Sequence, residues 1–293
     1  MFSHKLCWRE PGGRDGYATD GGFPFQMRAL AGLFDSTTLV LPCRRSIGHG
    51  SNTRLSGHNL TVVPLTVPKG QGVWHKMMFP LWMLRNMPVL IRETLRADAV
   101  HSPIPGDVGT IGMLLAVLFR KPLFVRHCGN WSVQTTHAEH FWKSFMQLMA
   151  GGTNVMLATG GGPMPPSERN SALRWIFSSA CTERELEAAR ERAAGRKPGH
   201  RLIIACRQDR EKGTGIAIES VSHLLRDLPD VALDVVGDGP ALEQWRQLAA
   251  SLGLADRITF HGKVAHDRVL DLLQQADLFC YPTAASEGFP KIV

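Results

Sequence analysis

Residues 201–240 contain two strand-to-helix boundaries that decide the fold. RLIIACR (201–207) is followed by QDREKG (208–213), and VALDVVG (231–237) is followed by DGP (238–240). Each apolar run is short, rich in β-branched residues and bounded by turn formers, which is typical of a strand buried on both faces. Helices are expected directly after them. This alternation of strands and helices indicates a parallel sheet with helices on both faces.

The same alternation continues on both sides of this stretch. The expected strands are 6–8, 37–42, 59–65, 98–101, 122–127, 154–159, 201–207, 231–237, 257–262 and 277–282. The expected helices are 23–34, 83–96, 108–119, 137–150, 212–227, 240–252 and 266–275. A charged segment at 183–199 separates the two halves. The sequence therefore predicts an α/β protein with two domains, 1–182 and 200–293, a connector at 183–199, and a ligand cleft between the domains.

The 293 residues carry a formal charge of +7, which is unevenly distributed. Residues 1–178 contain 18 Lys and Arg against 9 Asp and Glu, whereas residues 179–293 contain 15 against 17. A basic first half favours an anionic partner: a membrane leaflet, a nucleic acid or a phosphorylated small molecule. The stretch 73–96 mixes Trp, Met and Phe with Lys and Arg. It is interpreted either as a patch for peripheral contact with an anionic membrane or as core-packing helices interrupted by Pro80 and Pro88.

Cysteine usage and apolar runs predict the compartment. The six cysteines are scattered and no two form a Cys-x-x-Cys pair, so we expect buried free thiols rather than a disulfide framework or a zinc site. The first residues lack the apolar core of a signal peptide. The longest apolar run, 111–119, is about half of what a bilayer crossing needs. A cytoplasmic protein is expected.

Three segments of the second half carry candidate binding groups. Arg207 and Lys212 flank a strand-to-helix turn, where ligands of open α/β sheets bind and helix N-termini attract anions. Two cations there suit a diphosphate, or they belong to a solvated charged turn. Gly237 opens the next turn, but the segment lacks the third glycine of a dinucleotide fingerprint. In YPTAASEGFP, Glu287 and the amide of Gly288 are placed to bond sugar hydroxyls, or form a surface turn.

Together these segments, which occur in order between residues 201 and 290, resemble the GT4 family of retaining GT-B glycosyltransferases. The resemblance implies two Rossmann-like domains whose parallel sheets face each other across a cleft. It implies that Arg207 and Lys212 neutralise the nucleotide diphosphate. It also implies that Glu287, Gly288 and Phe289 hold the donor sugar, and that Lys263 and Val264 line the base.

The first half is similar to the family at two places. Gly21 and Gly22 precede a helix like the family's glycine loop, whose amides approach the diphosphate. His127 ends a strand where the family often has a His that faces the sugar or acceptor, although Cys128 stands where Asp is usual. His101 is a second candidate of this kind. The family's second glutamate would fall eight residues after Glu287, beyond Val293, so we expect a C-terminally truncated second domain.

The function implied by the resemblance is transfer of a sugar from a UDP- or GDP-sugar to the hydroxyl of a glycan or lipid-linked acceptor. Retention at the anomeric carbon, no cofactor and no metal are expected, and the sequence has no Asp-x-Asp motif. The implied setting is cell-envelope or exopolysaccharide synthesis, at the inner face of the membrane. The alternatives are a nucleotide-sugar epimerase of the same fold and an inactive nucleotide-sugar-binding fragment. A role in nucleic-acid binding would rest on charge alone and is not expected.

Overall fold

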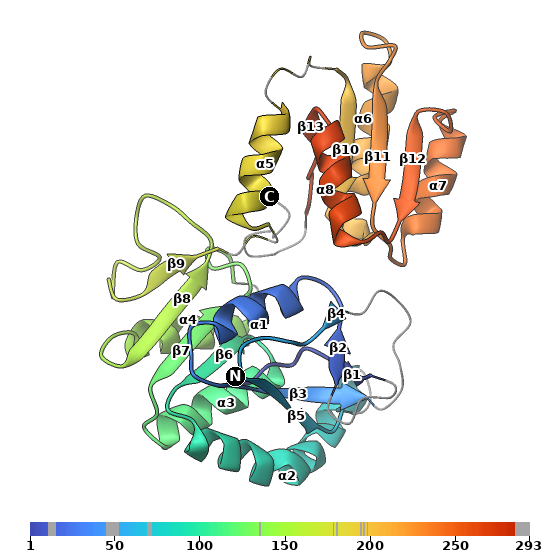
Figure 1. The fold of residues 1–293 in the computed structure, drawn as a ribbon. Coiled ribbons are helices and arrows are strands. Elements are labelled where there is room, and N and C mark those ends of the chain that lie inside the picture. Colours follow the sequence, from blue (N-terminus) through green and yellow to red (C-terminus); the bar gives the residue numbers. More distant parts are fainter. Residues whose placement is uncertain are drawn as a thin grey trace. The chain divides into compact units, whose positions relative to one another are not determined.

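The computed structural model describes residues 1–10, 16–44, 53–68, 72–134, 136–177, 179, 181–193, 195, 197 and 199–284, the side chains of residues 73, 75, 76 and 193 excepted. The chain divides into two compact units near residue 178 (Figure 1). The charged segment expected as a connector forms helix α5 (Glu183–Ala193) in the second unit. There Arg192 Nη1 donates a hydrogen bond to Gln274 Oε1 of helix α8 (His266–Gln275) at 2.7 Å.

The first unit contains two sheets joined by the first residues of the chain. Strands β1 (Cys7–Arg9), β3 (Thr37–Arg44) and β5 (Leu60–Leu65) are parallel, as are β6 (Val100–Ile104), β7 (Leu123–His127), β8 (Asn154–Thr159) and β9 (Arg174–Ile176). Phe2 N donates to His101 O on one side (2.9 Å), and Val40 N donates to Met1 O on the other (2.8 Å). The strands therefore follow a doubly wound order with the N-terminal segment at its centre.

Helices cover this sheet region through two clusters of buried apolar side chains. The helices are α1 (Phe23–Ala31), α2 (Gly72–Arg96), α3 (Asp107–Leu118) and α4 (His137–Met149). One cluster of buried side chains joins β6, β7 and β8 to α2, α3 and α4, and includes Trp82, Met113, Val125 and Met146. No helix in the described part of the chain is both long and apolar enough to span a bilayer.

Helix α2 is longer than the predicted helix 83–96: it is one element from Gly72 to Arg96, so the alternative of helices interrupted at the prolines is wrong. Pro80 and Pro88 both lie inside the helix and are exposed. Proline removes one backbone hydrogen bond to the preceding turn. On the exposed side of a helix the carbonyl that is freed can bond to water instead, which explains why the helix continues.

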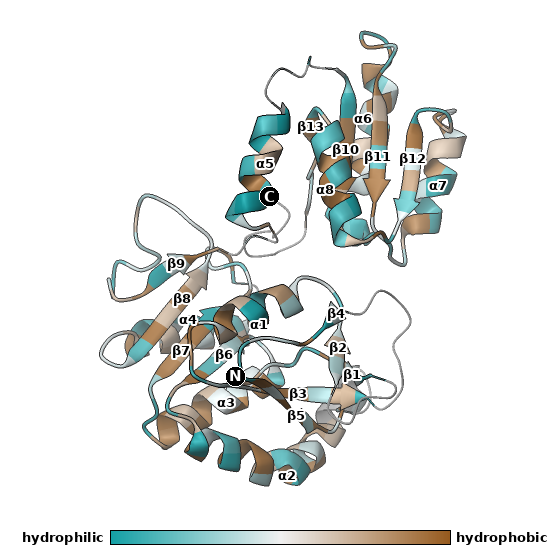
Figure 2. Ribbon diagram, in the orientation of Figure 1, coloured by the Kyte–Doolittle hydropathy of each residue, from teal (hydrophilic) through white to brown (hydrophobic). Residues whose placement is uncertain are grey.

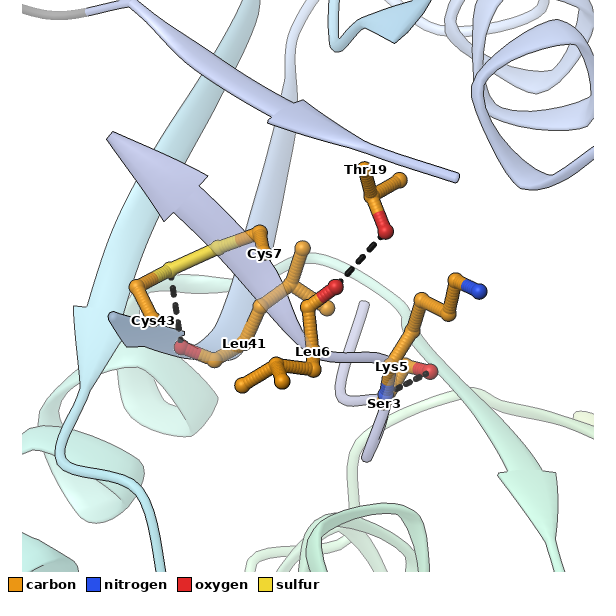
Figure 3. The surroundings of a disulfide bond; sticks show 7 residues. All are labelled: Ser3, Lys5, Leu6, Cys7, Thr19, Leu41 and Cys43. Atoms are coloured by element: carbon orange, nitrogen blue, oxygen red, sulfur yellow. Dashed lines mark hydrogen bonds between the residues drawn. A yellow bond between two sulfur atoms is a disulfide. The ribbon is translucent and has the colours of Figure 1, made fainter. Parts of the chain in front are cut away.

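The region beside β1 contains two features that the sequence did not predict. Two short antiparallel strands, β2 (Tyr17–Thr19) and β4 (Thr53–Arg54), extend the sheet beside β1. Cys7 and Cys43 lie directly opposite each other on β1 and β3, with their Cα atoms 4.6 Å apart, and form a disulfide (Figure 3). The expectation of free thiols is wrong for this pair, because strand register brings together two cysteines that are 36 residues apart in the sequence.

The second unit is a four-stranded parallel sheet in the order β12-β11-β10-β13. Its strands are β10 (Arg201–Ala205), β11 (Ala232–Val236), β12 (Ile258–Gly262) and β13 (Leu278–Phe279). Helices α6 (Thr214–Leu224) and α7 (Leu242–Ser251) pack on one face, and α8 packs on the other through Leu272. The middle strands are apolar along most of their length (Figure 2), as expected for strands covered on both faces.

Candidate functional site

The carboxyl ends of three parallel strands in the second unit are tied together by backbone hydrogen bonds. Cys206 N donates to Val236 O at 3.1 Å, and Gln208 N donates to Asp238 O at 3.0 Å. Gly237 N donates to Gly262 O at 2.8 Å. The loops that follow β10, β11 and β12 therefore share one edge of the sheet, which is the edge where open α/β sheets bind ligands.

Two glycines are required for the loops after β10 and β11 to pack. Gly237 has φ +116°, and a Cβ atom there would lie 1.9 Å from Cys206 O. A Cβ atom at Gly239 would lie 2.5 Å from Gln208 O. The sequence predicted Gly237 as a candidate ligand-binding glycine, with an ordinary turn as the alternative. In the structure the two glycines allow the backbone of one loop to contact the backbone of the next.

Gln208 is the residue in this region that the sequence analysis missed. Its side chain is fully buried, and its Nε2 donates to Cys206 O (3.0 Å) and Val236 O (3.1 Å). Its Oε1 accepts from Thr214 Oγ1 in the first turn of α6 (2.8 Å). The amide therefore connects β10, β11 and α6 beneath the loop. The only signal in the sequence was an uncharged polar residue within a charged turn, which does not by itself predict burial.

The two predicted cations lie on this loop. Arg207 follows β10 and is largely exposed, with Nε 3.2 Å from Asp209 Oδ2. Lys212 ends a 3₁₀ turn (Arg210–Lys212) and is half-buried. Gly213 then caps α6 in the left-handed conformation at φ +82°. The structure thus brings Arg207 and Lys212 onto one loop that leads into a helix N-terminus, a favourable place for an anion.

The chain after β13 returns to the same loop. Ala284 N donates to Glu211 O at 2.8 Å, and Thr283 Oγ1 donates to the same oxygen at 3.1 Å. A Cβ atom at Gly213 would lie 2.0 Å from Pro282 O. Because β10 lies between β11 and β13, this is also the point where the order of strands reverses, the usual binding position in such sheets. Glu287, Gly288 and Phe289 lie outside the described residues.

The two residues expected to line a base follow β12. Lys263 is exposed directly after the strand. Val264 is half-buried and packs with the cluster that contains Ile203 and Leu272. Their backbone therefore lies at the same sheet edge as Gly237, because Gly262 immediately precedes them and accepts from Gly237 N.

The first unit carries the other predicted residues. Gly21 has φ +71°, Gly22 caps α1, and a Cβ atom at either would have no neighbour within 4 Å. His127 ends β7 but is buried, with its ring edge-on to Trp131. Burial lowers the pKa of His127, although a hydrogen bond with the backbone of Gly129 acts in the opposite direction. A buried, neutral imidazole has one ring nitrogen that donates and one that accepts, so it is suited to binding a hydroxyl group.

His101 lies further back on β6 and its ring contacts Phe124. Burial, the N-terminal amino group and Arg126 lower its pKa to about 3. His101 lies inside its strand, whereas His127 lies at the end of its strand. Within the described residues, no three His, Cys, Asp or Glu side chains gather as a metal-binding group.

Solved structures with the same architecture define the class of fold. The chain is similar to Anabaena HepE in complex with UDP-glucose over 99% of this chain and 76% of that one, with a TM-score of 0.55 and 16% identity. It is also similar to sucrose-phosphate synthase of Thermosynechococcus elongatus over 98% and 74%, with a TM-score of 0.59 and 13% identity. These relations confirm the predicted α/β fold of the GT-B glycosyltransferases.

A family model matches part of the sequence within that fold. Residues 187–293 match the family "Glycosyl transferases group 1", the family that the motifs of this segment predicted.

Two relatives illustrate the range of that likeness. Alpha-D-kanosaminyltransferase of Streptomyces kanamyceticus is 26% identical over 74% of this chain. The GDP-mannose-dependent alpha-(1-6)-phosphatidylinositol monomannoside mannosyltransferase of Mycobacterium tuberculosis H37Rv is 36% identical over 29% of it. These alignments cover 60% and 22% of the relatives' own lengths, so the chain spans only part of each.

Proposed function

We propose that this chain is the sugar-transferring part of a retaining glycosyltransferase that takes its donor from a nucleotide-diphosphate sugar. The observation that carries the proposal is the loop at the switch point of the second sheet. There Arg207 and Lys212 precede the N-terminus of α6, within a domain of the group 1 family. In this proposal the diphosphate binds at that loop.

The chemistry needs stabilisation of negative charge on a leaving group. The bond between the anomeric carbon and the diphosphate oxygen breaks with its electron pair, and a new bond forms from the acceptor oxygen to that carbon. The acceptor hydroxyl gives its proton to the departing diphosphate oxygen, and the nucleoside diphosphate leaves. Arg207, Lys212 and the amides at the start of α6 are preorganised for charge that develops on the diphosphate. We infer that these groups make a divalent cation unnecessary.

The same proposal assigns roles to the other residues that were predicted from the sequence. Glu287, Gly288 and Phe289 hold the donor sugar, and the backbone of Lys263 and Val264 lines the base. His127 faces the sugar or the acceptor from the first unit, and the amides after Gly21 and Gly22 approach the diphosphate. The acceptor is a glycan or a lipid-linked sugar of the cell envelope.

Relatives with different donors support a nucleotide sugar without deciding which one. The mycobacterial relative is named for GDP-mannose, whereas the Anabaena structure contains UDP-glucose. Both UDP- and GDP-sugars therefore belong in the test.

The proposal is tested by measuring nucleoside diphosphate released from UDP- and GDP-sugars with and without a panel of hydroxyl acceptors. We expect acceptor-dependent release that falls at least about tenfold in Arg207→Ala and Lys212→Ala, the size expected for loss of a charge-assisted hydrogen bond. Arg226→Ala is the matched control. Arg226 is exposed after α6, on the segment that leads to the amino end of β11, whereas Arg207 and Lys212 lie at the carboxyl ends of the strands. Proton NMR of the product should show the donor's anomeric configuration.

Two outcomes would contradict the proposal. Turnover of the donor without any acceptor, with a changed sugar configuration, would identify an epimerase. Nucleotide binding without turnover across the panel would identify a binding fragment.

A further inference from the structure

Helix α2 exposes an apolar stripe along most of its length. Trp74, Met77, Leu81 and Leu84 are 60%, 64%, 62% and 70% exposed, and Leu95 continues the stripe at 50%. The spacing of three and four residues places them on one side of the helix. Figure 2 shows brown and teal alternating along α2. A contiguous exposed apolar face of this kind indicates an interaction surface.

The opposite side of α2 is firmly attached to its own unit. Trp82 is buried, and its Nε1 donates to Thr66 O at 2.6 Å. Asn86 is buried and receives a hydrogen bond from Thr66 N at 3.1 Å. Leu90 belongs to the main core of the unit. One side of α2 therefore packs against the core of its own unit, and the exposed stripe is a second apolar face on another side of the helix.

Positive charge accompanies this stripe. Arg85, Arg92 and Arg96 are exposed on the same helix. The only carboxylate in the sequence of α2, Glu93, is 10% exposed and accepts from Arg92 Nε at 2.8 Å. The outer surface of α2 is therefore apolar and basic, with its one acidic side chain largely buried.

The surface continues onto the end of α3. Lys121 Nζ donates to Leu95 O at 2.8 Å, which joins the segment after α3 to the last turn of α2. Leu114 and Leu118 of α3 are 45% and 70% exposed, and Arg120 follows them. The same combination of leucine and arginine thus occurs on two neighbouring helices.

We propose that the outer face of α2, extended by the end of α3, docks on an anionic lipid bilayer. Leucines and a tryptophan enter the interface between headgroups and acyl chains, while arginines contact anionic headgroups. The positive charge of this face favours an anionic bilayer over a second copy of the chain as its partner. A symmetric contact between two copies would bring arginines together without opposing carboxylates. The excess of basic residues in positions 1–178 acts in the same direction. The surface requires no bound nucleotide, so it is independent of the donor site.

The test is sedimentation of the chain, without nucleotide, with vesicles of phosphatidylcholine alone and of phosphatidylcholine mixed with phosphatidylglycerol. We expect binding to the anionic vesicles that weakens as salt rises and screens the charges. The double variant Leu81→Ser/Leu84→Ser should weaken binding at least about tenfold. Arg85→Gln and Arg96→Gln should each weaken it about fivefold. Leu33→Ser is the control, because Leu33 is 75% exposed after a different helix, α1.

Three results would overturn the proposal. The first is absence of binding to anionic vesicles by a chain with native circular dichroism. Binding that the α2 variants and Leu33→Ser change equally would place the contact elsewhere. A dimer in sedimentation equilibrium that Leu81→Ser/Leu84→Ser converts to a monomer would assign the face to self-association.

Discussion

Arg201 on β10 donates two hydrogen bonds to Asp234 on the neighbouring strand β11. Nε lies 2.6 Å from Oδ2, and Nη2 lies 3.1 Å from Oδ1. His261 Nε2 on β12 lies 2.6 Å from the same Oδ1. Burial would raise the pKa of Asp234, but the hydrogen bonds from Arg201 and His261, together with their charges, hold it below its ordinary value. Three adjacent strands are thus connected through one buried carboxylate.

Replacing this carboxylate should destabilise the second unit in a pH-dependent way. Asp234→Asn is expected to lower the free energy of unfolding by about 2 kcal/mol at neutral pH, the scale of hydrogen bonds to a charged group. Because the folded pKa is lowered, the stabilisation is present above the unfolded value of about 3.9 and is lost as the pH falls below it. Urea unfolding at neutral and acidic pH measures this. Asp227→Asn, an exposed control, should change little, and an equal loss at every pH would contradict the account.

His101 gives the first unit a different acid dependence. Its pKa is lowered to about 3, so unfolding binds a proton wherever the pH lies between that value and the unfolded value of about 6.5. Stability should therefore fall as the pH decreases through this window, by up to about 1.4 kcal/mol per pH unit. His101→Leu should flatten the slope, whereas His58→Leu, at an exposed position, should retain it. Parallel slopes for all three proteins would show that His101 does not titrate as described.

The glycine after β11 should tolerate no side chain. Gly237→Ala is expected to cost at least about 2 kcal/mol, because the new Cβ meets Cys206 O and the backbone is already at positive φ. Gly253→Ala is the matched control: φ is +70° there, but nothing lies within 4 Å of the added atom, so the strain alone should cost about 1 kcal/mol. Thermal unfolding compares them. Equal losses of stability in the two variants would show that the close contact between the two loops does not contribute to stability.

Gln208 should contribute to the stability of the second unit. Gln208→Leu leaves Cys206 O, Val236 O and Thr214 Oγ1 without their side-chain partner, which is expected to cost about 2 to 3 kcal/mol. Gln244→Leu removes an exposed amide that accepts from Arg210 and should cost under about 0.5 kcal/mol. Chemical denaturation tests the difference, and a stability for Gln208→Leu close to that of Gln244→Leu would exclude the buried network.

Most of the parallel strands could be predicted, because each is a short apolar run between turn formers. RLIIACR ends as a strand at Ala205, and VALDVVG forms β11 at 232–236. Strands β2, β4 and β9 were missed because each has only two or three residues, which is too few to show a pattern. The pairing of Cys7 with Cys43 depends on the register between strands, which local sequence does not contain.

The candidate site was predicted in part, for a similar reason. Arg207 and Lys212 are recognisable because charge at a strand-to-helix turn has a direct chemical meaning. Gln208 is not recognisable, because its importance comes from two carbonyl groups on different strands that meet it only in the folded chain. The burial of His127 likewise follows from packing against Trp131, four residues further on in a loop.

The central claim, that the loop holding Arg207 and Lys212 binds the diphosphate of a nucleotide, is tested most directly by calorimetric titration. UDP and then GDP are titrated into the chain and into Arg207→Ala, Lys212→Ala and the control Arg226→Ala. The account predicts that one of the two nucleotides binds to the unaltered chain and to the control. Each of the two loop variants should lose at least about 1 kcal/mol of binding free energy. Nucleotide binding of equal strength in all four proteins, or none in a folded chain, would contradict it.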